Sequence, residues 1–257
     1  MIKKEVIRVK NLTMGYGENI LLENVSFDVN KSDIFIVMGG SGCGKSSVLR
    51  ILNGLLLPIK GKVFVEDIDI INGNLSDIQK IREKTGILYQ SGALFSSMTL
   101  AENIALPLQQ YTNYSANMIY ELANFKLSLV GLSGYADYYP SEISGGMKKR
   151  AGLARALALD PDIVYFDEPS AGLDPISSRN LDELILELNK SLKTTFVVVT
   201  HELDSIFTIG NNSIFLDADT KSIMARGNPK DLLKNPPNEK IYEFLKRGDE
   251  DNVFKTK

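Results

Sequence analysis

The stretch Ile34-Phe-Ile-Val-Met-Gly-Gly-Ser-Gly-Cys-Gly-Lys-Ser46 indicates the fold of this 257-residue chain. Residues 34–38 form a near-continuous apolar run, which is typical of a strand that is buried on both faces of a sheet. A glycine-rich loop follows directly, and residues 45–53 have the pattern of a helix that stops at Gly54. A buried strand, a glycine-rich loop and a helix in this order predict a phosphate-binding loop in an α/β protein.

The loop residues 39–46 fit the pattern Gly-x-x-x-x-Gly-Lys-Ser. Glycines allow backbone N–H groups to turn inward around phosphate oxygens, and the N-terminus of the following helix adds positive partial charge. We expect Lys45 to reach the β- and γ-phosphates of a nucleotide and the Ser46 hydroxyl to ligate Mg²⁺. The alternative, a flexible loop of glycine and serine, does not explain the strand and the helix on either side.

The composition narrows the class of protein. Hydrophobic residues make up 44% of the chain and charged residues 24%, as in ordinary globular proteins, so a disordered or fibrous chain is not expected. The net charge of −3 gives no reason to expect a nucleic-acid binder. One cysteine and one histidine exclude an intrachain disulfide, a zinc site made of cysteines and a site with several histidines.

The sequence shows neither a signal peptide nor a membrane span. Residues 1–10 alternate charged and apolar side chains and lack the apolar core of a signal peptide. The longest charge-free run, residues 103–120, contains polar residues and proline, whereas a transmembrane helix needs about 20 mostly apolar residues. We therefore expect a cytoplasmic chain whose membrane role, if it has one, is that of a peripheral subunit.

Strands and helices alternate along much of the chain. We expect strands at 6–9, 25–29, 34–38, 62–65, 86–89, 163–166 and 196–200, and a helix at 177–192. This alternation predicts a mainly parallel sheet with helices on both faces. Residues 91–160 have a helical pattern without a buried-strand run. The expected organisation is one domain, 1–257, with a core (1–90 and 160–227), an inserted helical lobe (91–159) and a tail (228–257).

Two acidic residues follow a buried strand. Residues 163–166 are apolar, and Asp167 and Glu168 come next, which places both acids at the carboxyl edge of the sheet, where open α/β folds bind ligands. We expect Asp167 to hold Mg²⁺ through water and Glu168 to orient the attacking water and accept its proton. The alternative is two solvated acids, and the phosphate loop weighs against it.

Three further side chains lie where a nucleotide is expected. His201 follows the strand at 196–200 and Gln90 follows the strand at 86–89, so both lie at carboxyl ends of strands. His201 is predicted to hydrogen-bond the γ-phosphate and the water, and Gln90 to contact Mg²⁺ or the water and report nucleotide state to the lobe. Tyr16, between two glycines, is predicted to stack on a base. The alternatives are an ordinary surface histidine and glutamine and a packed turn tyrosine.

A second anion site is predicted at the start of a helix. The segment Ser141-Glu-Ile-Ser-Gly-Gly-Met-Lys-Lys-Arg150 precedes an apolar-periodic helix, residues 151–159. Ser144, Gly145 and Gly146 offer a hydroxyl and unhindered N–H groups to an anion. Because the chain already has its own phosphate loop, this second site suggests a nucleotide that is bound in trans by a second subunit.

These motifs, in this order, resemble the ATPase subunits of ABC transporters over roughly residues 6–227. The order is Tyr16, residues 39–46, Gln90, Ser144-Gly-Gly146, Asp167-Glu168, Ser170-Ala-Gly-Leu-Asp174 and His201. The resemblance implies a P-loop NTPase fold, that is, a RecA-like core with an N-terminal antiparallel β portion and an inserted helical subdomain. It also implies two subunits in a head-to-tail sandwich with two ATP at the interface.

The resemblance assigns the site residues as follows. ATP is bound by Tyr16, Gly39, Gly40, Ser41, Gly42, Cys43, Gly44, Lys45, Ser46 and Ser47, by Asp174 at the contact between the two sites, and in trans by Ser144, Gly145 and Gly146. Mg²⁺ is bound by Ser46, Gln90 and Asp167. Hydrolysis depends on Glu168 as the catalytic base, His201 as the γ-phosphate switch, Gln90 and Lys45.

The sequence departs from the family pattern at a few positions. Ile143 and Met147 replace the usual Leu and Gln of the signature segment, and Cys43 and Ser47 replace frequent Ser and Thr residues of the phosphate loop. None of these changes removes a required donor, so we expect ATP hydrolysis. Cys43 lies beside Lys45 and near a helix N-terminus, which predicts a lowered thiol pKa and ATP-protected alkylation that blocks activity.

Local stretches point to one group of transporters. Gln90-Ser-Gly-Ala-Leu-Phe95, Asn103-Ile-Ala-Leu-Pro107, Ser144-Gly-Gly-Met-Lys-Lys-Arg150, Thr200-His-Glu-Leu203 and Phe244-Leu-Lys-Arg-Gly248 resemble the Mla-type ATPases of MCE lipid transport systems. This implies phospholipid transport, a homodimer on the cytoplasmic face of the inner membrane, a membrane permease, an MCE-type lipid-binding protein and a small accessory subunit. Leu94 and Phe95 would receive a permease helix or, alternatively, form lobe core.

Other functions stay open at this point. An importer ATPase of the same fold for a small polar solute, such as an amino acid, is the main alternative. An ABC protein acting on DNA or ribosomes usually has two cassettes or a long coiled-coil insertion, and this chain has neither. A subunit that binds ATP without hydrolysing it is disfavoured by the intact Lys45, Asp167, Glu168 and His201.

The tail contains an apolar stripe. Ile241, Tyr242, Phe244 and Leu245 lie on one side of a helix-sized segment, residues 238–247. The stripe predicts docking either on the chain's own domain or on a second subunit or accessory protein.

Overall fold

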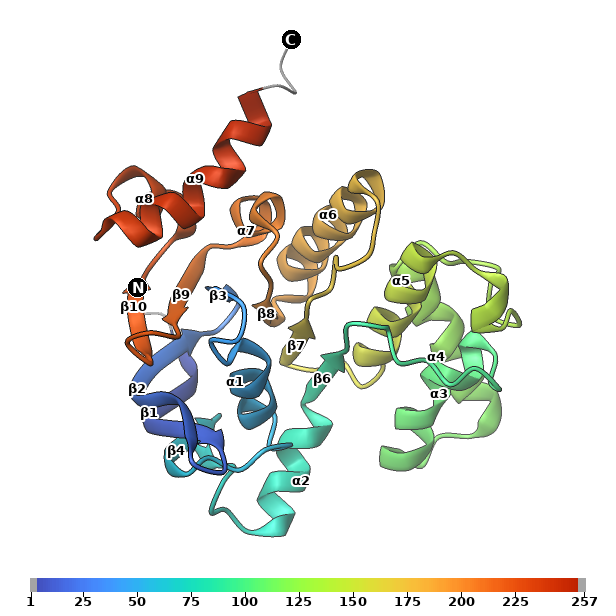
Figure 1. Ribbon diagram of the computed structural model, residues 1–257. Coiled ribbons are helices and arrows are strands. Elements are labelled where there is room, and N and C mark those ends of the chain that lie inside the picture. Colours follow the sequence, from blue (N-terminus) through green and yellow to red (C-terminus); the bar gives the residue numbers. More distant parts are fainter. Residues whose placement is uncertain (1–3, 254–257) are drawn as a thin grey trace. The chain divides into compact units, whose positions relative to one another are not determined.

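The computed structural model describes the backbone of residues 4–253 and the side chains of residues 4–246 (Figure 1). The chain forms two compact units, Met1–Gly73 with Val197–Lys257, and Asn74–Phe196. Both units contain strands and helices, so the predicted α/β class is confirmed. The division into core and lobe at residues 91–159 stays a prediction.

The first unit contains an antiparallel sheet. Its strands are β1 (Glu5–Tyr16), β2 (Asn19–Asn30), β4 (Lys60–Val65) and β5 (Ile68–Asp69), in the order β2-β1-β4-β5. β1 and β2 are longer than the sequence predicts. Asn11 and Asn24 adopt positive φ angles and the β1–β2 register shifts nearby, so irregularities interrupt the alternating apolar pattern without ending the strands.

The first unit also contains the parallel strands that carry the phosphate loop. β3 (Ile34–Gly39) is buried along its whole length and pairs in parallel with β9 (Asn212–Asp217), and β10 (Ser222–Arg226) pairs antiparallel with β9. β8 (Thr195–Val199) is the strand at which the chain passes from the second unit into the first. The helices are α1 (Lys45–Leu52), α7 (Leu203–Ile209), α8 (Pro229–Lys234) and α9 (Glu239–Val253).

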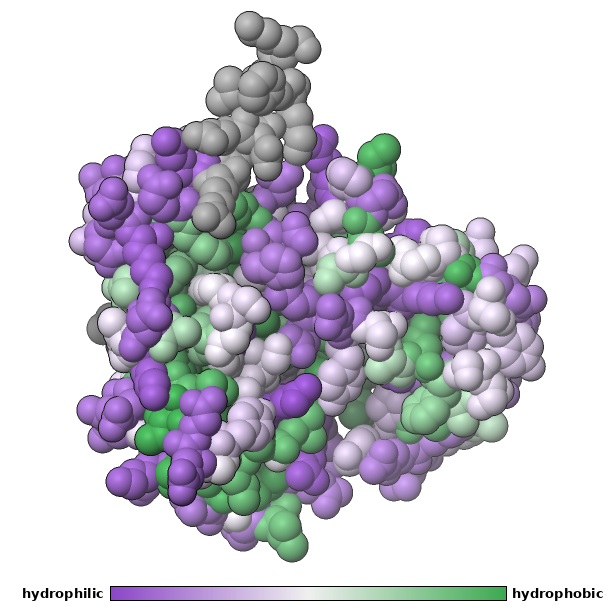
Figure 2. All heavy atoms as spheres, in the orientation of Figure 1, coloured by the Kyte–Doolittle hydropathy of each residue, from purple (hydrophilic) through white to green (hydrophobic). Residues whose placement is uncertain are grey.

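The second unit contains two parallel strands and a group of helices. β6 (Thr85–Leu88) pairs in parallel with β7 (Ile163–Asp167). The helices are α2 (Leu75–Glu83), α3 (Leu100–Tyr111), α4 (Ala116–Leu129), α5 (Gly145–Ala156) and α6 (Pro175–Leu192), with a short 3₁₀ turn at Pro140–Glu142. α3, α4 and α5 pack against one another. Figure 2 shows hydrophobic side chains among hydrophilic ones on the face of these helices.

Polar side chains define where these helices begin. Thr99 and Glu102 form a capping box at α3, Ser115 accepts a hydrogen bond from an N–H group of α4, and Ser144 and Asp174 do the same for α5 and α6. Side-chain caps of this kind satisfy N–H groups that have no partner within the helix, and a lost cap costs about 1 kcal/mol. The signature segment therefore becomes helical from Gly145 onward, earlier than the sequence predicts.

The tail packs within the first unit. Ile241 and Leu245 of α9 are fully buried, and Phe244 contacts Phe215 of β9 edge to face, with 5.0 Å between ring centroids. Tyr242 is 37% exposed. Docking of the stripe on the chain's own domain is therefore confirmed for three of its four residues. Residues 254–257 of the predicted tail lie outside the described part of the chain.

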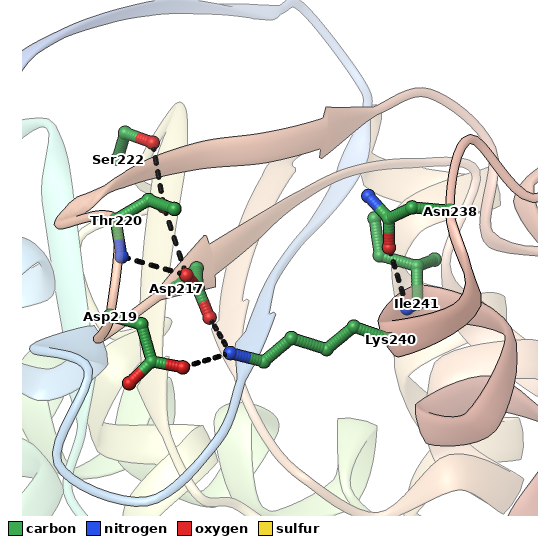
Figure 3. A network of polar contacts seen from close by, with 7 residues as sticks. All are labelled: Asp217, Asp219, Thr220, Ser222, Asn238, Lys240 and Ile241. Carbon is green, nitrogen blue, oxygen red and sulfur yellow. Dashed lines mark hydrogen bonds and ion pairs between the residues drawn. The ribbon is translucent and has the colours of Figure 1, made fainter.

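An ionic contact fixes α9 beside β9. Figure 3 shows Lys240 reaching from α9 to Asp217 and Asp219, where β9 ends, and its ammonium forms ion pairs with both carboxylates. Asp217 is only 3% exposed and also accepts hydrogen bonds of 2.9 Å from the N–H and the hydroxyl of Thr220. A buried carboxylate with this many donors anchors the tail.

Within residues 4–253, the longest helices are too short or too polar to cross a bilayer.

Candidate nucleotide-binding site

The phosphate loop connects β3 to α1 in the first unit. Gly39 has a φ of 146°, and a side chain on it would place its Cβ atom 2.2 Å from the carbonyl oxygen of Leu216. Gly44 has a φ of 95°, and a Cβ atom there would lie 2.5 Å from the Met14 methyl carbon. Only glycine fits both positions, so the close turn of the loop depends on the glycines that the motif contains.

Lys45 points back over the loop. Its ammonium donates hydrogen bonds of 3.0 Å to the carbonyl oxygens of Gly39 and Gly40. Ser41 and Gly42 are exposed, Ser46 and Ser47 are half-buried, and α1 begins without a side-chain cap or an acidic residue in its first turn. A cation, exposed loop backbone and an uncapped helix N-terminus are the groups that bind a phosphate chain. The residues present therefore fit ATP.

Cys43 differs from the expectation. Its side chain is 1% exposed, and burial raises its pKa above the usual value, although the charge of Lys45 and two backbone N–H groups act in the opposite direction. The predicted lowering of the thiol pKa is wrong, because the side chain turns into the interior beneath the loop. The prediction that Cys43 contacts the nucleotide then rests on its backbone alone.

Tyr16 lies beside the phosphate loop. It is the last residue of β1, its side chain is exposed, and its hydroxyl lies 3.0 Å from the Ser47 hydroxyl. Ser47 thus joins the phosphate loop to a tyrosine whose ring is open to solvent. Stacking of a base on this ring stays a prediction.

His201 lies in the first unit, two residues after the end of β8. Its side chain is exposed, and its Nε2 atom lies 3.7 Å from Glu202. An imidazole that is 58% exposed has room to contact a ligand. Its γ-phosphate role stays a prediction.

The second unit brings Gln90 and the acidic pair to one edge of its sheet. Leu88 of β6 lies opposite Phe166 of β7 in a parallel pair. Gln90 and Glu168 each follow two residues later, so they leave the sheet at the same end. Asp167 is half-buried, and Glu168 has a left-handed backbone with a φ of 51°. This conformation is uncommon for a residue with a side chain and clusters at functional sites.

The second unit also contains the signature segment and the aspartate that follows the acidic pair. Ser144 caps α5 by accepting a 3.3 Å hydrogen bond from the N–H of Met147, and Gly145 and Gly146 form the first turn. Asp174 caps α6, and hydrogen bonds from the Ser177 hydroxyl and from backbone N–H groups hold the pKa of its carboxyl below the usual value. Their contacts with a second subunit stay predictions.

A buried lysine is the residue that sequence reasoning missed. Lys149 of α5 is 5% exposed, and its ammonium donates to the carbonyl oxygens of Gln90 and Glu168. The sequence contains it within the run Lys148-Lys149-Arg150, which reads as a solvated basic surface. A helical wheel would place position 149 on the buried side of α5, four residues before Leu153.

Sequence comparisons identify the family of the chain. The family model described as "ABC transporter" matches residues 22–171. The MlaF protein of Haemophilus influenzae, named an intermembrane phospholipid transport system ATP-binding protein, is 38% identical over 100% of this chain and 96% of its own length. The Mycobacterium leprae protein mkl, named a probable ribonucleotide transport ATP-binding protein, is 39% identical over 93% of this chain and 68% of its own length.

Solved structures have the same fold. The ATP-binding cassette MJ0796, a dimer bound to ADP and Pi in a post-hydrolysis state, has a TM-score of 0.77 and 30% identity, over 86% of this chain and 98% of that one. CbiO1 from Clostridium perfringens, part of an ABC transporter complex, has a TM-score of 0.81 and 25% identity, over 91% and 92%. The predicted fold class is confirmed, and the chain belongs to the ATP-binding subunits of ABC transporters.

Proposed function

We propose that this chain is the ATP-hydrolysing subunit of a membrane transporter and that it works as a homodimer around two ATP. The observation that carries the proposal is the phosphate loop, in which Lys45 and the glycines form a cradle for a phosphate chain. Family membership and the structure of a relative bound to ADP and Pi support the same reaction.

The chain's residues have separate tasks in this proposal. Lys45 and the loop backbone bind the β- and γ-phosphates, while Ser46, Asp167 and Gln90 hold Mg²⁺, which would neutralise the charge that develops on the phosphates. Glu168 orients the attacking water and accepts its proton. His201 hydrogen-bonds the γ-phosphate. Ser144, Gly145 and Gly146 of one subunit contact the ATP of the other, and Asp174 lies where the two sites meet.

A groove in the second unit is the proposed docking site of the permease. The groove has a volume of about 680 Å³ and is lined by residues of β6, α3 and α5 and of the loop after β6, among them Tyr89, Phe95, Pro107 and Arg155. Phe95 is 54% exposed. An apolar groove beside Gln90 fits an amphipathic or apolar helix of a membrane partner. A partner in the groove would contact Tyr89, the residue before Gln90, which is proposed to contact Mg²⁺ or the water.

One buried side chain fixes the loop that contributes Phe95 to the groove. Asn103 is fully buried, and its amide oxygen accepts a 2.7 Å hydrogen bond from the N–H of Phe95. Its amide nitrogen donates to the carbonyl oxygens of Phe95, Met98 and Thr99 at 2.9–3.2 Å. The loop at 95–99 is therefore fixed to the start of α3 from within.

The proposed substrate is phospholipid. Two relatives are named intermembrane phospholipid transport system ATP-binding proteins. They are the Haemophilus influenzae protein and the MlaF protein of Escherichia coli K12, which is 38% identical over 93% of this chain. The alignment with the first includes the tail. The proposal includes an MCE-type lipid-binding protein, a small accessory subunit and a place on the cytoplasmic face of the inner membrane. A nucleotide or another small polar solute is the second candidate, because the mycobacterial relative is named for ribonucleotide transport.

Purification of the chain from its native membrane with its partners tests this function. We expect a membrane permease and an MCE-type protein to co-purify and organic extraction to recover phospholipid. The complex, reconstituted in vesicles, should move a fluorescent phospholipid in the presence of ATP, and the Lys45→Ala complex should not. Transport of a radiolabelled ribonucleotide without movement of lipid would favour the second candidate, and a complex without ATPase activity would contradict both.

A further inference from the structure

Lys149 is a buried cation in the second unit, in contact with two of the predicted site residues. It lies in the second turn of α5, and its side chain is almost completely removed from solvent, whereas its neighbour Lys148 is half-exposed. Burial of an ammonium group is unfavourable unless hydrogen bonds replace water. The partners that replace water at Lys149 therefore decide what this residue does.

The partners of Lys149 are two backbone carbonyl groups. The ammonium donates one hydrogen bond to the carbonyl oxygen of Gln90 and a second, of 3.3 Å, to that of Glu168. These residues begin the loops that follow β6 and β7, which are neighbouring parallel strands. Burial lowers the pKa of Lys149 below its usual value, and the nearby charge of Glu168 acts in the opposite direction.

The backbone of Glu168 needs support. Its φ of 51° is left-handed, a conformation that is unfavourable for a residue with a Cβ atom and persists where the surroundings hold it. The carbonyl oxygen of this residue accepts from Lys149 and, at 3.2 Å, from the N–H of Ala171. Because the backbone conformation sets the direction of the Cα–Cβ bond, a donor on this carbonyl also limits where the carboxylate can lie.

α5 holds the loop after β6 at several points. Arg155 donates to the carbonyl oxygens of Gly92 and Ala93 at 3.2 Å and 2.8 Å, and Gly92 packs against α5 so closely that a Cβ atom on it would lie 3.1 Å from the Lys148 carbonyl oxygen. Arg155 also lines the groove. A partner in the groove therefore contacts a loop that is hydrogen-bonded to α5. Through Lys149, α5 is also hydrogen-bonded to the carbonyl group of Glu168.

We propose that Lys149 is a positioning residue for ATP hydrolysis, whose ammonium ties the carbonyl groups of Gln90 and Glu168 together and so fixes the Glu168 carboxylate relative to the loop beside the permease groove. The inference rests on the proposed function, because it takes Glu168 as the base. Lys149 touches neither nucleotide nor water in this role. It acts on the rate of the chemical step and on its response to the permease, and not on ATP affinity.

The test compares Lys149→Met with Lys148→Met in the purified transporter complex. Methionine keeps an unbranched side chain that fills most of the space of lysine, but it is one atom shorter and cannot donate. We expect Lys149→Met to lower kcat at least about tenfold, the effect of losing a charged hydrogen bond, with the KM for ATP within about twofold of wild type. The stimulation of ATPase activity by the permease should also be lost. Lys148→Met should leave kcat, KM and stimulation unchanged.

Two further variants separate positioning from folding. Lys149→Arg keeps the charge and the donors and should recover part of kcat. Lys149→Gln keeps a polar group for folding, but its amide nitrogen is one atom short of Nζ and reaches one carbonyl at most, so kcat should fall about fivefold at unchanged KM. If Lys149→Met unfolds, as judged by its thermal transition, the Gln and Arg variants carry the test.

Clear outcomes would overturn the inference. Wild-type kcat and permease stimulation in a folded Lys149→Met or Lys149→Gln variant would do so, as would an equal loss of activity in Lys148→Met. Loss of ATP binding in a folded variant would assign Lys149 to the nucleotide and not to Glu168. Failure of the proposed function has a different signature, namely normal turnover in Glu168→Gln.

Discussion

At the scale of single residues, Glu168 carries the most direct prediction. Glu168→Gln removes the carboxylate that accepts the proton of the attacking water but keeps the size of the side chain. It leaves the phosphate loop unchanged, because that loop lies elsewhere in the chain. We expect ATP binding to persist, turnover to fall at least about a hundredfold and an ATP-bound dimer to accumulate. Phosphate release and size-exclusion chromatography with ATP measure these effects.

His201 provides the companion variant. His201→Ala should also lose hydrolysis with ATP affinity nearly unchanged, because its exposed imidazole is assigned to the γ-phosphate and not to the adenosine part. Normal turnover in the first variant would refute the assigned base, and normal turnover in the second would refute the γ-phosphate contact.

Cys43 leads to a prediction that reverses the expectation from the sequence. Only the thiolate reacts with alkylating reagents, and burial both raises the thiol pKa and blocks access. A raised pKa means that the thiolate fraction at neutral pH is lower than in a free cysteine and increases only as the pH rises above the usual range. We expect slow labelling by iodoacetamide at pH 7, equal with and without ATP.

Denatured protein is the control for Cys43 and should label quickly. Fast labelling of the folded chain that ATP prevents would contradict the buried placement. Mass spectrometry of the intact chain follows both reactions.

The difference between Cys43 and Lys45 shows what a motif can predict. The spacing of glycines and lysine requires a loop with this backbone, so the position of Lys45 follows from the sequence. The direction of a side chain within the loop depends on what lies beneath it, here the strand that contains Leu216. For the same reason the contacts of Lys149 were not predictable, since they join segments that are about sixty and twenty residues away.

At the scale of elements, the strands were predictable where burial is complete on both faces. β3, β7 and β8 are continuous apolar runs, and their predicted bounds differ from the observed ones by one residue. β9 and β10 were missed, because Asp217 and Arg226 put charges at the ends of short apolar segments. Asp217 is stabilised in its buried position by hydrogen bonds from Thr220 and by Lys240 of the tail, and the contact with Lys240 is a tertiary contact.

The contact between α9 and β9 predicts an acid-sensitive tail. Burial acts to raise the pKa of Asp217, but the Lys240 and Thr220 hydrogen bonds and the Lys240 charge outweigh it, so the pKa lies below the usual value. A carboxyl whose folded pKa is depressed stabilises the fold above its unfolded pKa of about 3.9 and loses that contribution as the pH falls further. We expect the protection of backbone amides in residues 238–246, that is, their exchange rate relative to the intrinsic rate at the same pH, to decrease below about pH 4.

Lys240→Ala tests the same contact at neutral pH. It should accelerate exchange in residues 238–246 at pH 7 and lower the thermal midpoint by a few degrees. The control on the same helix is Lys246→Ala, which removes an ammonium that lies over the Tyr242 ring. Unchanged exchange in Lys240→Ala would show that Ile241, Phe244 and Leu245 hold the tail without the ion pairs.

At the scale of the whole molecule, the residues predicted to bind nucleotide occur in both units. The first unit contains Tyr16, the phosphate loop and His201, and the second contains Gln90, the signature segment, the acidic pair and Asp174. The motif order along the chain predicts this set, and the action of its members in one site stays a prediction. The bounds of the units were not predictable, since they depend on which segments pack together across the chain.

Assembly supplies the prediction at this scale. Deletion of the residues after Pro237 removes α9, whose apolar side chains Ile241 and Leu245 are buried within the chain's own first unit. We expect the truncated chain to be less stable but still to form an ATP-dependent dimer in the Glu168→Gln background. Analytical ultracentrifugation with ATP measures this. Loss of the dimer in a truncated chain that remains folded would assign α9 to the second subunit or to an accessory protein.

The buried amide of Asn103 has a thermodynamic consequence for assembly. Because its hydrogen bonds already hold the backbone around Phe95 and Met98, a permease that docks as proposed would meet a groove whose conformational entropy was lost when the chain folded. Docking should then show the negative heat-capacity change of apolar burial without the additional entropy cost of ordering a loop. With fewer internal hydrogen bonds, the same apolar area would bind its partner with lower affinity and a slower association rate.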